Sequence, residues 1–263
     1  MSGVIIDNEV SHYEVMGHGR PVLFLHDWLG SWRYWMPAMQ IVSSLNYKTM
    51  AIDFWGYGDS SRNKRAYRIQ DQTKLIYQFL NHLKLDKIAI VGHGLGAIVA
   101  MNFAKQYYHR VDRLFLISCP MSDSSFSPRL FEDTPFDLAN WLLDKDADAH
   151  LVLEEIHKVD LQSMRVSLQE AKEMDLINLW KIGQHKSLFV HGVLDQAIIS
   201  PSERRFLTLP DHMHGILIEE GGHYPMLEDT SKFSRLLVEF LMLDAETSPR
   251  NLSVKDKWIR RVR

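Results

Sequence analysis

Short apolar runs alternate with longer segments of helical spacing along most of the chain. Continuous apolar runs rich in β-branched residues are typical of strands buried on both faces of a sheet, and apolar residues three or four positions apart are typical of helices. Strands are expected at residues 4–6, 12–15, 22–25, 49–52, 88–91, 114–117, 187–190 and 215–218. Helices are expected at residues 33–46, 69–84, 97–101 and 230–242. This alternation predicts an α/β protein with a mostly parallel sheet of about eight strands and helices on both faces.

One long segment interrupts the alternation. Residues 121–185 contain segments of helical character and no strand-like run. A helical insertion of this kind in an α/β domain is expected to lie over one end of the sheet as a cap. The predicted organisation is an α/β core over residues 1–120 and 186–245, a helical cap over residues 121–185 and a tail over residues 246–263.

Composition and charge exclude several classes of protein. The chain has 263 residues, of which 46% are hydrophobic and 24% charged, as in globular proteins and unlike disordered ones. A net charge of −3 argues against nucleic-acid binding through bulk electrostatics. No apolar run approaches the roughly 20 residues of a membrane-spanning helix, and residues 1–8 lack the pattern of a signal peptide. With Cys119 as the single cysteine, we expect a cytoplasmic protein without a disulfide, metal or cofactor.

The charged residues are unevenly distributed. Residues 121–185 hold 13 acidic and 6 basic residues, which gives −7, whereas residues 246–263 hold 6 basic and 2 acidic residues, which gives +4. The tail has the spacing of a short basic amphipathic helix with Trp258 on its apolar side. We expect this tail to dock onto protein, within the chain or across a homodimer, rather than to bind a membrane surface.

The residues 88–97 have the sequence IAIVGHGLGA, which predicts a strand, a tight turn and a helix. In the pattern G-x-S-x-G, the central residue of such a turn carries an exposed nucleophile. Here Gly92 and Gly96 frame a third glycine, Gly94, at that central position. The turn therefore lacks a side chain that could act as a nucleophile.

Further motifs follow the other expected strands. Asp195 ends the sequence HGVLD after one strand-like run, and His223 lies in the sequence GGHYP after the next. The sequences LHDW and DFWGYGDS follow two strand-like runs that precede the glycine turn. The order of turn, acid and histidine is the order in which one class of catalytic triad occurs along the chain.

Together these motifs resemble the α/β-hydrolase superfamily over about residues 3–243. They are most similar to its capped branch of esterases, epoxide hydrolases and haloalkane dehalogenases. The resemblance implies that Asp195 is the acid and His223 the base of a catalytic triad. It also implies that Trp28 and Leu95 provide the backbone amides of an oxyanion hole.

Two positions depart from the family pattern. Gly94 stands where the family has serine, aspartate or cysteine, so its covalent mechanism of hydrolysis cannot operate. Asp27 stands where the family usually has glycine, and an ionised carboxylate there would repel negative charge at the oxyanion site. Asp27 either points into the space left by Gly94, which links the two departures, or caps the turn that follows it. The sequence favours neither alternative.

Three interpretations of the missing nucleophile remain. The favoured one is a natural non-hydrolytic pseudo-hydrolase that binds a small, largely apolar molecule under the cap. The second is a serine-type carboxylic ester hydrolase in which engineering has replaced the serine by Gly94. The third is a cofactor-free enzyme that uses only the acid–base dyad of His223 and Asp195.

Other notable residues are expected to have mainly structural roles. Aromatic and apolar side chains of the core and cap are expected partly to line a pocket and partly to pack together. These are Trp28, Trp32, Tyr34, Trp35, Phe126, Phe131, Phe136, Trp141 and Leu142. His26 and His93 are expected to make local hydrogen bonds, and Cys119 to be an inert buried thiol.

Overall fold

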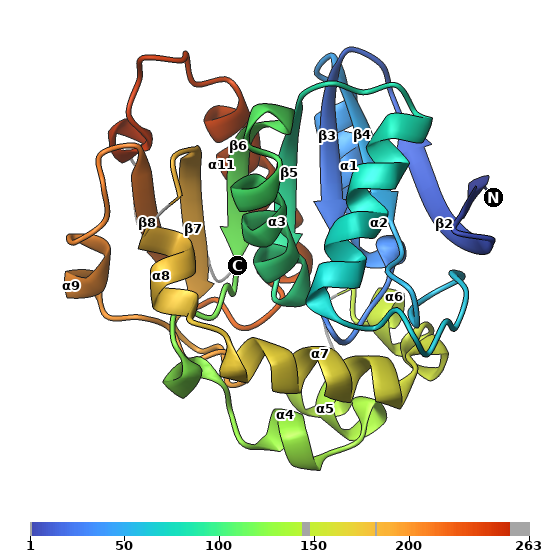
Figure 1. The fold of residues 1–263 in the computed structure, drawn as a ribbon. Coiled ribbons are helices and arrows are strands. Elements are labelled where there is room, and N and C mark those ends of the chain that lie inside the picture. The colour runs from blue at the N-terminus through green and yellow to red at the C-terminus, as the bar shows by residue number, and fades with distance from the viewer. Residues whose placement is uncertain (1, 144–147, 182, 253–263) are drawn as a thin grey trace.

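The fold is seen in a computed structural model that describes residues 2–143, 148–181 and 183–252. In these ranges eight strands form one sheet in the order β1-β2-β4-β3-β5-β6-β7-β8 (Figure 1). The strands are β1 (Ser2–Ile6), β2 (Glu9–Met16), β3 (Arg20–Leu25), β4 (Tyr47–Ile52), β5 (Ile88–His93), β6 (Val111–Ile117), β7 (Lys186–Gly192) and β8 (Met213–Ile218). The tail beyond residue 252, with Trp258, lies outside the described residues.

The sheet is antiparallel at one edge and parallel elsewhere. β1 and β2 form a hairpin joined by Asp7 and Asn8, which both have a positive φ, as a two-residue hairpin turn of this hand requires. β2 also pairs antiparallel with β4, and the remaining neighbours from β4 to β8 are all parallel. The predicted fold class is confirmed.

Helices cover both faces of the sheet (Figure 1). α1 and α11 pack together on one face, while α2, α3 and α8 (Leu176–Lys181) lie on the other. Outside the insertion, the α-helices are α1 (Met36–Ser43), α2 (Ile69–His82), α3 (Leu95–Gln106), α9 (Glu203–Phe206), α10 (Pro225–Glu228) and α11 (Thr230–Leu241). Short 3-10 helices are η1 (Trp32–Trp35), η2 (Tyr108–Arg110) and η5 (Pro249–Asn251).

The long connection between β6 and β7 is helical. Its elements are η3 (Asp123–Ser125), α4 (Arg129–Glu132), α5 (Pro135–Leu142), α6 (His150–Leu153), η4 (Ile156–Lys158), α7 (Leu161–Glu173) and α8 (Leu176–Lys181). α7 runs across the carboxyl ends of the parallel strands, with α4 and α5 beyond it (Figure 1). It is tied to the loop after β3 by the Trp28 Nε1–H group, which donates to Ser167 Oγ at 3.1 Å. We use the name cap helices for α4 to α7, because α8, which the expected cap over residues 121–185 includes, lies on a face of the sheet beside α3.

One expected helix is divided in the structure. The segment predicted as a single helix at residues 33–46 begins as the 3-10 helix η1, continues as α1 and ends at Ser43. Pro37 occupies the first turn of α1, where its missing N–H group costs no helical hydrogen bond. Asn46 then has a positive φ of 62°, which turns the chain into β4.

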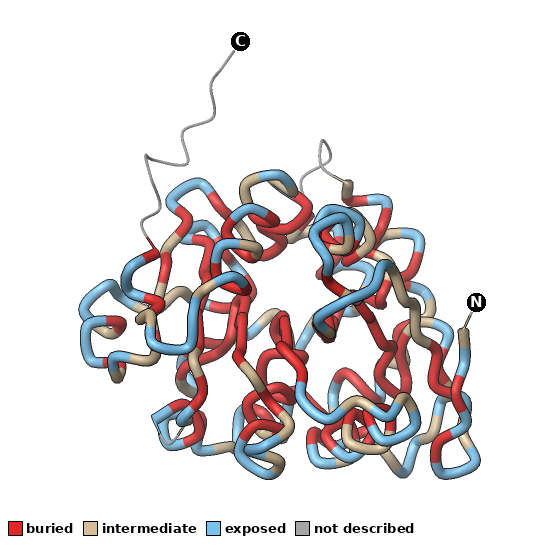
Figure 2. The backbone as a smooth tube through the Cα atoms, turned by 90° about the horizontal axis from the view of Figure 1, so that it is seen from above, coloured by how far each residue is buried: buried red, intermediate tan, exposed pale blue. Residues whose placement is uncertain are grey.

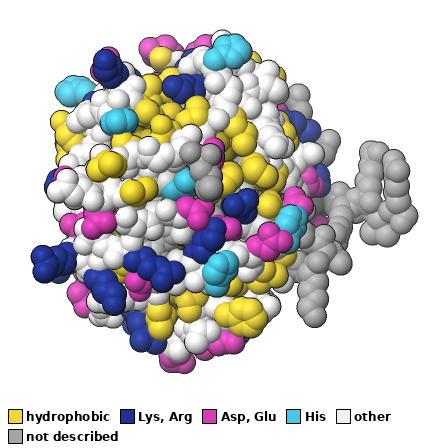
Figure 3. Space-filling model, turned by 90° about the vertical axis from the view of Figure 1, so that its right-hand side faces the viewer, with side chains coloured by type: hydrophobic (Ala, Val, Ile, Leu, Met, Phe, Trp, Pro, Cys, Tyr) yellow, Lys and Arg dark blue, Asp and Glu magenta, His cyan; other side chains and the backbone are white. Residues whose placement is uncertain are grey.

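Burial follows the layers. Buried residues run along the central strands and the inner sides of the helices, and exposed residues along the outer loops (Figure 2). On the face seen from the β1–β2 side, charged side chains of both signs are interspersed with hydrophobic ones (Figure 3). Among the described helices, none combines the length and apolar character needed to cross a bilayer.

Candidate active site

The glycine turn connects β5 to α3 as the sequence predicts. Gly94 has a φ of +48°, a conformation that glycine adopts with least strain, and it directly precedes the first residue of α3. Its amide donates to the Ile117 carbonyl at 3.0 Å, and the Gly96 amide donates to the His26 carbonyl at 3.1 Å. A β-carbon on Gly92 would lie 2.5 Å from the Gly96 carbonyl oxygen, so this close turn requires glycine there.

The side chain of Asp27 fills the space beside Gly94. A β-carbon on residue 94 would lie 2.5 Å from Asp27 Cγ and would overlap Asp27 Oδ1. Asp27 Oδ1 accepts a hydrogen bond from the Leu95 amide at 3.1 Å. The side chain thus points into the space beside Gly94, which is the first of the two alternatives, and Ser31 rather than Asp27 accepts the bond from the Arg33 amide that caps η1. The two departures from the family pattern are therefore linked in space.

The Asp27 carboxylate also meets the second expected oxyanion donor. A hydrogen bond from the Trp28 backbone helps to lower the pKa of Asp27. Of the two amides that the resemblance assigns to an oxyanion hole, the Leu95 amide donates to the Asp27 carboxylate at 3.1 Å, and the Trp28 backbone contributes to lowering the pKa of the same group. Asp27 is 1% exposed, so these bonds form out of contact with solvent.

Asp195 and His223 form the expected pair. Asp195 follows β7 and His223 follows β8, and the His223 Nδ1 atom lies 3.0 and 2.9 Å from the two carboxylate oxygens of Asp195. Asp195 Oδ1 also accepts from the amides of Ala197 and Ile198 at 2.9 and 3.0 Å. Its Oδ2 accepts from the Ser118 hydroxyl at 2.7 Å. These bonds fix the carboxylate and, through it, the orientation of the imidazole.

His223 also contacts Asp27, so its imidazole lies between two carboxylates. His223 Nε2 lies 3.1 Å from Asp27 Oδ2. Burial alone would lower the pKa of His223, but Asp195 and Asp27 outweigh burial and raise that pKa to about 10. Burial would raise the pKa of each carboxyl, but His223 lowers both, that of Asp195 to about 2. At neutral pH the group is an imidazolium held between two carboxylates.

Two further residues hold Asp27 in place and were not singled out for this by the sequence. The Tyr34 hydroxyl accepts from the Asp27 amide at 2.8 Å and lies 3.1 Å from His93 Nδ1. Burial lowers the pKa of His93 to about 3, so this imidazole is neutral. Tyr34 could be noticed in the sequence only as a member of the aromatic cluster, because its partners are set by the fold.

The other residues considered from the sequence are distributed as follows. His26 Nδ1 lies 2.7 Å from the Asp27 carbonyl, and His26 Nε2 accepts from the Phe54 amide at 3.0 Å, which fits a structural histidine. Cys119 is buried, and burial raises the pKa of its thiol to about 12, so the thiol is unreactive. Trp28 of the core meets Phe126 of the insertion at 6.1 Å between ring centroids.

The expected lining residues do not all face the site. Phe136 is 61% exposed, so it cannot line a buried pocket in this structure. Trp141 is half-buried and packs under the Arg129 guanidinium at 4.1 Å. Trp35 packs against Phe24 in the core.

Two groups of side chains have a composition that could hold a metal ion. One contains Asp27, His93 and His223, whose ligand atoms lie within 4.8 Å of one another, and the other contains His12, Asp53 and Asp59. Two histidines and a carboxylate suit a transition metal. In the first group, however, a direct bond between Asp27 and His223 already joins two of the three residues.

The chain matches the family described as alpha/beta hydrolase fold over residues 20–181, more than half of its length. This chain belongs to the α/β-hydrolase family. It is 30% identical over 106 residues to a soluble epoxide hydrolase of Corynebacterium sp., covering 40% of this chain and 37% of that protein. It is 24% identical to a 2-hydroxy-6-oxo-2,4-heptadienoate hydrolase of Pseudomonas putida, covering 86% of this chain and 90% of that protein.

Solved structures of α/β hydrolases show the same fold. An esterase from Exiguobacterium antarcticum superposes with a TM-score of 0.80 at 19% identity, covering 91% of this chain and 98% of the esterase. The chain covers 37%, 21% and 30% of the first three curated relatives that it matches, so whole-protein similarity to them is limited. These similarities establish the family and the fold, whereas the activity has to be inferred from the residues of the site.

Proposed function

We propose that this α/β hydrolase is non-hydrolytic and binds a small, neutral, largely apolar molecule under its cap helices. The observation that carries the proposal is the position of the Asp27 carboxylate, which takes the place of a side chain on residue 94. Ester hydrolysis by this family needs three free components, namely a nucleophile, oxyanion donors and a base. In this chain each component is missing or already engaged.

The nucleophile is absent, and the oxyanion donors and the base are engaged by Asp27. Gly94 has no side chain, and the Leu95 amide already donates to Asp27. His223 is protonated at neutral pH because its pKa is raised by Asp195 and Asp27. An imidazolium cannot accept a proton from water or substrate, which also argues against an enzyme that uses only the His223–Asp195 dyad as its base.

The same arrangement favours a natural binding protein over an engineered hydrolase. Replacement of a serine by glycine would account for Gly94 and leave Asp27 unexplained. A carboxylate that fits the space, accepts the Leu95 amide and pairs with His223 accounts for both positions together.

The character of the ligand is inferred from charge and from the aromatic contact. Two carboxylates and one imidazolium leave the buried group with a net negative charge, which disfavours anionic ligands. Trp28 and Phe126 meet where the loop after β3 approaches the insertion. A neutral aromatic or aliphatic molecule therefore suits this region best.

The test is an ester-hydrolysis assay on p-nitrophenyl acetate with five forms of the protein. The unmodified chain and the Gly94→Ser variant are expected to be inactive, since the serine lacks room and free oxyanion donors. The double variant Gly94→Ser with Asp27→Gly is expected to gain activity that a further His223→Ala change removes. Turnover by the unmodified chain that His223→Ala abolishes would refute the proposal.

The binding part has its own test. Fluorescence titration with 2-naphthol, a neutral aromatic probe, is expected to show saturable binding that Phe126→Ala weakens. Phe136→Ala is the matched control, because Phe136 lies in the same insertion but is 61% exposed. Equal binding by both variants, or no binding by the unmodified protein, would count against a ligand site under the cap helices.

A further inference from the structure

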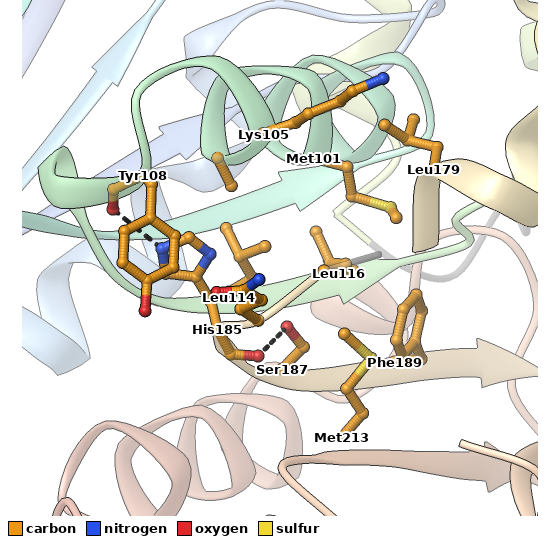
Figure 4. A pocket seen from close by; sticks show the side chains of 13 residues that line it. Met101, Lys105, Tyr108, Leu114, Leu116, Leu179, His185, Ser187, Phe189 and Met213 are labelled. Carbon is orange, nitrogen blue, oxygen red and sulfur yellow. Dashed lines mark hydrogen bonds between the residues drawn. The ribbon is translucent and has the colours of Figure 1, made fainter. Parts of the chain in front are cut away.

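A cavity lies beside the sheet, away from Asp27, Asp195 and His223. It has a volume of about 340 Å³ and is bounded by residues of α3, α8, β6, β7 and β8 and their adjoining loops (Figure 4). Sites for small molecules commonly have volumes of roughly 300–1,000 Å³, so the cavity is large enough to hold one. None of the residues placed at the candidate active site lines it.

The cavity lies beside a helix that is shorter than the strands it packs against. α8 has six residues, or about 9 Å of helix, whereas the seven residues of β6 and of β7 each extend over about 23 Å. The helix is therefore much shorter than the strands, and the cavity lies between it and α3. Apolar side chains of the strands, including Leu114, Leu116 and Phe189, line the cavity.

The inner wall of the cavity is apolar and adaptable. Leu116 and Phe189 are fully buried, and Met101 and Met213 complete the wall from α3 and β8. Methionine side chains are flexible and adjust to the shape of an apolar ligand. This wall suits a hydrocarbon chain and offers few partners to a polar molecule.

One side of the cavity carries a cation. Lys105 of α3 is exposed and, within the described part of the chain, makes no hydrogen bond or ion pair. His185 also lines the cavity, but its Nε2 atom is bonded to the Tyr108 carbonyl at 2.9 Å and burial lowers its pKa, so it is neutral. Lys105 is thus the one formally charged residue among the thirteen that line the cavity (Figure 4).

We propose that this cavity is a second binding site, which takes an amphipathic anion with an apolar chain and a single anionic head group. The chain lies against the wall formed by Leu116, Phe189 and Met213, and the head group pairs with Lys105. The site is independent of the proposed function, because it uses other residues and favours a charge that the buried group around Asp27 disfavours.

Isothermal titration calorimetry with three probes of equal chain length tests the proposal. Decanoate is expected to bind more tightly than 1-decanol or decyltrimethylammonium. Lys105→Glu is expected to weaken decanoate binding about five-fold, which is the size expected for loss of an exposed ion pair. The same variant is expected to strengthen binding of the cationic probe. Lys64→Glu is the matched control, since Lys64 is also exposed but lies outside the cavity lining, and it should leave all three affinities unchanged.

A second variant tests the apolar wall. Ala104 lines the cavity from α3, and Ala104→Phe is expected to abolish binding of all three probes by filling the space. Phe126→Ala, at the candidate active site, should leave decanoate binding unchanged and so separates the two sites. Unaltered decanoate binding by Lys105→Glu or by Ala104→Phe, equal binding of decanoate and decanol, or no decanoate binding at all would overturn the proposal.

Discussion

The Asp27 side chain leaves room only for glycine at residue 94, because a β-carbon on Gly94 would overlap Asp27 Oδ1. The backbone at Gly94 keeps the φ of +48° that the sharp turn needs, while the polar groups around it are bonded to Asp27. The glycine and the aspartate thus form a single structural unit, although 67 positions separate residue 94 from residue 27 in the sequence.

This relationship predicts that substitutions at the two positions are not additive. Gly94→Ser alone is expected to lower the free energy of unfolding by about 1–3 kcal/mol, because the new side chain overpacks a buried site. With Asp27→Gly in the same chain, the loss should be smaller than the sum of the two single losses by about 0.5–3 kcal/mol. Urea denaturation of the four forms measures this coupling.

Gly3 provides the control for that cycle. A β-carbon on Gly3 would meet Val10 Cγ1 at 3.6 Å, which is an ordinary contact. Gly3→Ser combined with Asp27→Gly should therefore show additive effects. If the Gly94→Ser cycle is equally additive, Asp27 does not occupy the space beside residue 94.

Asp27→Asn is expected to lower the pKa of His223, because one of the two carboxylates beside the imidazole is lost. The same change should destabilise the protein at pH 7 by about 3 kcal/mol or more, since it breaks a buried ion pair. NMR titration of the histidine side chains measures the pKa in both proteins. Asp59→Asn is the control, and an unchanged His223 pKa in Asp27→Asn would contradict the bond between the two residues.

Stability should fall as the pH rises from about 6.5. The folded-state pKa of His223 is raised to about 10 from 6.5, so folding favours its protonated form. The contribution of His223 to the free energy of unfolding is complete below pH 6.5. It is lost progressively up to pH 10, at no more than about 1.4 kcal/mol per pH unit. Denaturation between pH 6.5 and 8.5 measures the slope.

The slope must be compared between proteins, because the pKa of His12 is also raised and acts in the same direction. Asp27→Asn keeps His12 and should show a shallower decline than the unmodified chain. Identical slopes would mean that Asp27 does not hold the proton on His223.

His191→Leu is expected to stabilise the protein. His191 is fully buried, and neither of its ring nitrogens has a hydrogen-bond partner among the described residues. Burial lowers its pKa to about 4, so the unfolded chain binds the proton more readily and stability is lost as the pH falls below 6.5. The gain is expected to be about 1–2 kcal/mol at pH 7 and larger at pH 5.

His26→Leu is the matched control when the free energy of unfolding of His191→Leu is measured. His26 is equally buried, but both of its ring nitrogens are bonded, to the Asp27 carbonyl and the Phe54 amide. Its replacement should destabilise the protein because the Phe54 amide would lose its partner. A loss of stability in both variants would show that His191 contributes packing that leucine cannot replace.

The sequence was sufficient for the sheet and for the meeting of Asp195 with His223. Apolar runs mark strands locally, and residues that follow parallel strands come together at one edge of the sheet. The direction of the Asp27 side chain could not be predicted in this way. It depends on the Leu95 amide, 68 positions away, and on empty space beside Gly94, neither of which leaves a local signal.

The cavity beside β6 and β7 was likewise beyond prediction. A sequence pattern shows that residues 121–185 are helical, but the space that remains beside the sheet depends on where α8 ends. Helix ends are the least certain part of a pattern-based assignment. The division of the long helix expected at residues 33–46 into η1 and α1 reflects the same uncertainty.

The fit between Gly94 and Asp27 also limits the order in which mutations at the two positions can be tolerated. A single mutation that restores serine at residue 94 meets an occupied space, and a single mutation that removes Asp27 strips His223 of a buried counter-charge. Each of the two substitutions, made alone, is thus expected to give a less stable protein. A chain that carries both residues is therefore expected to change them together rather than one at a time.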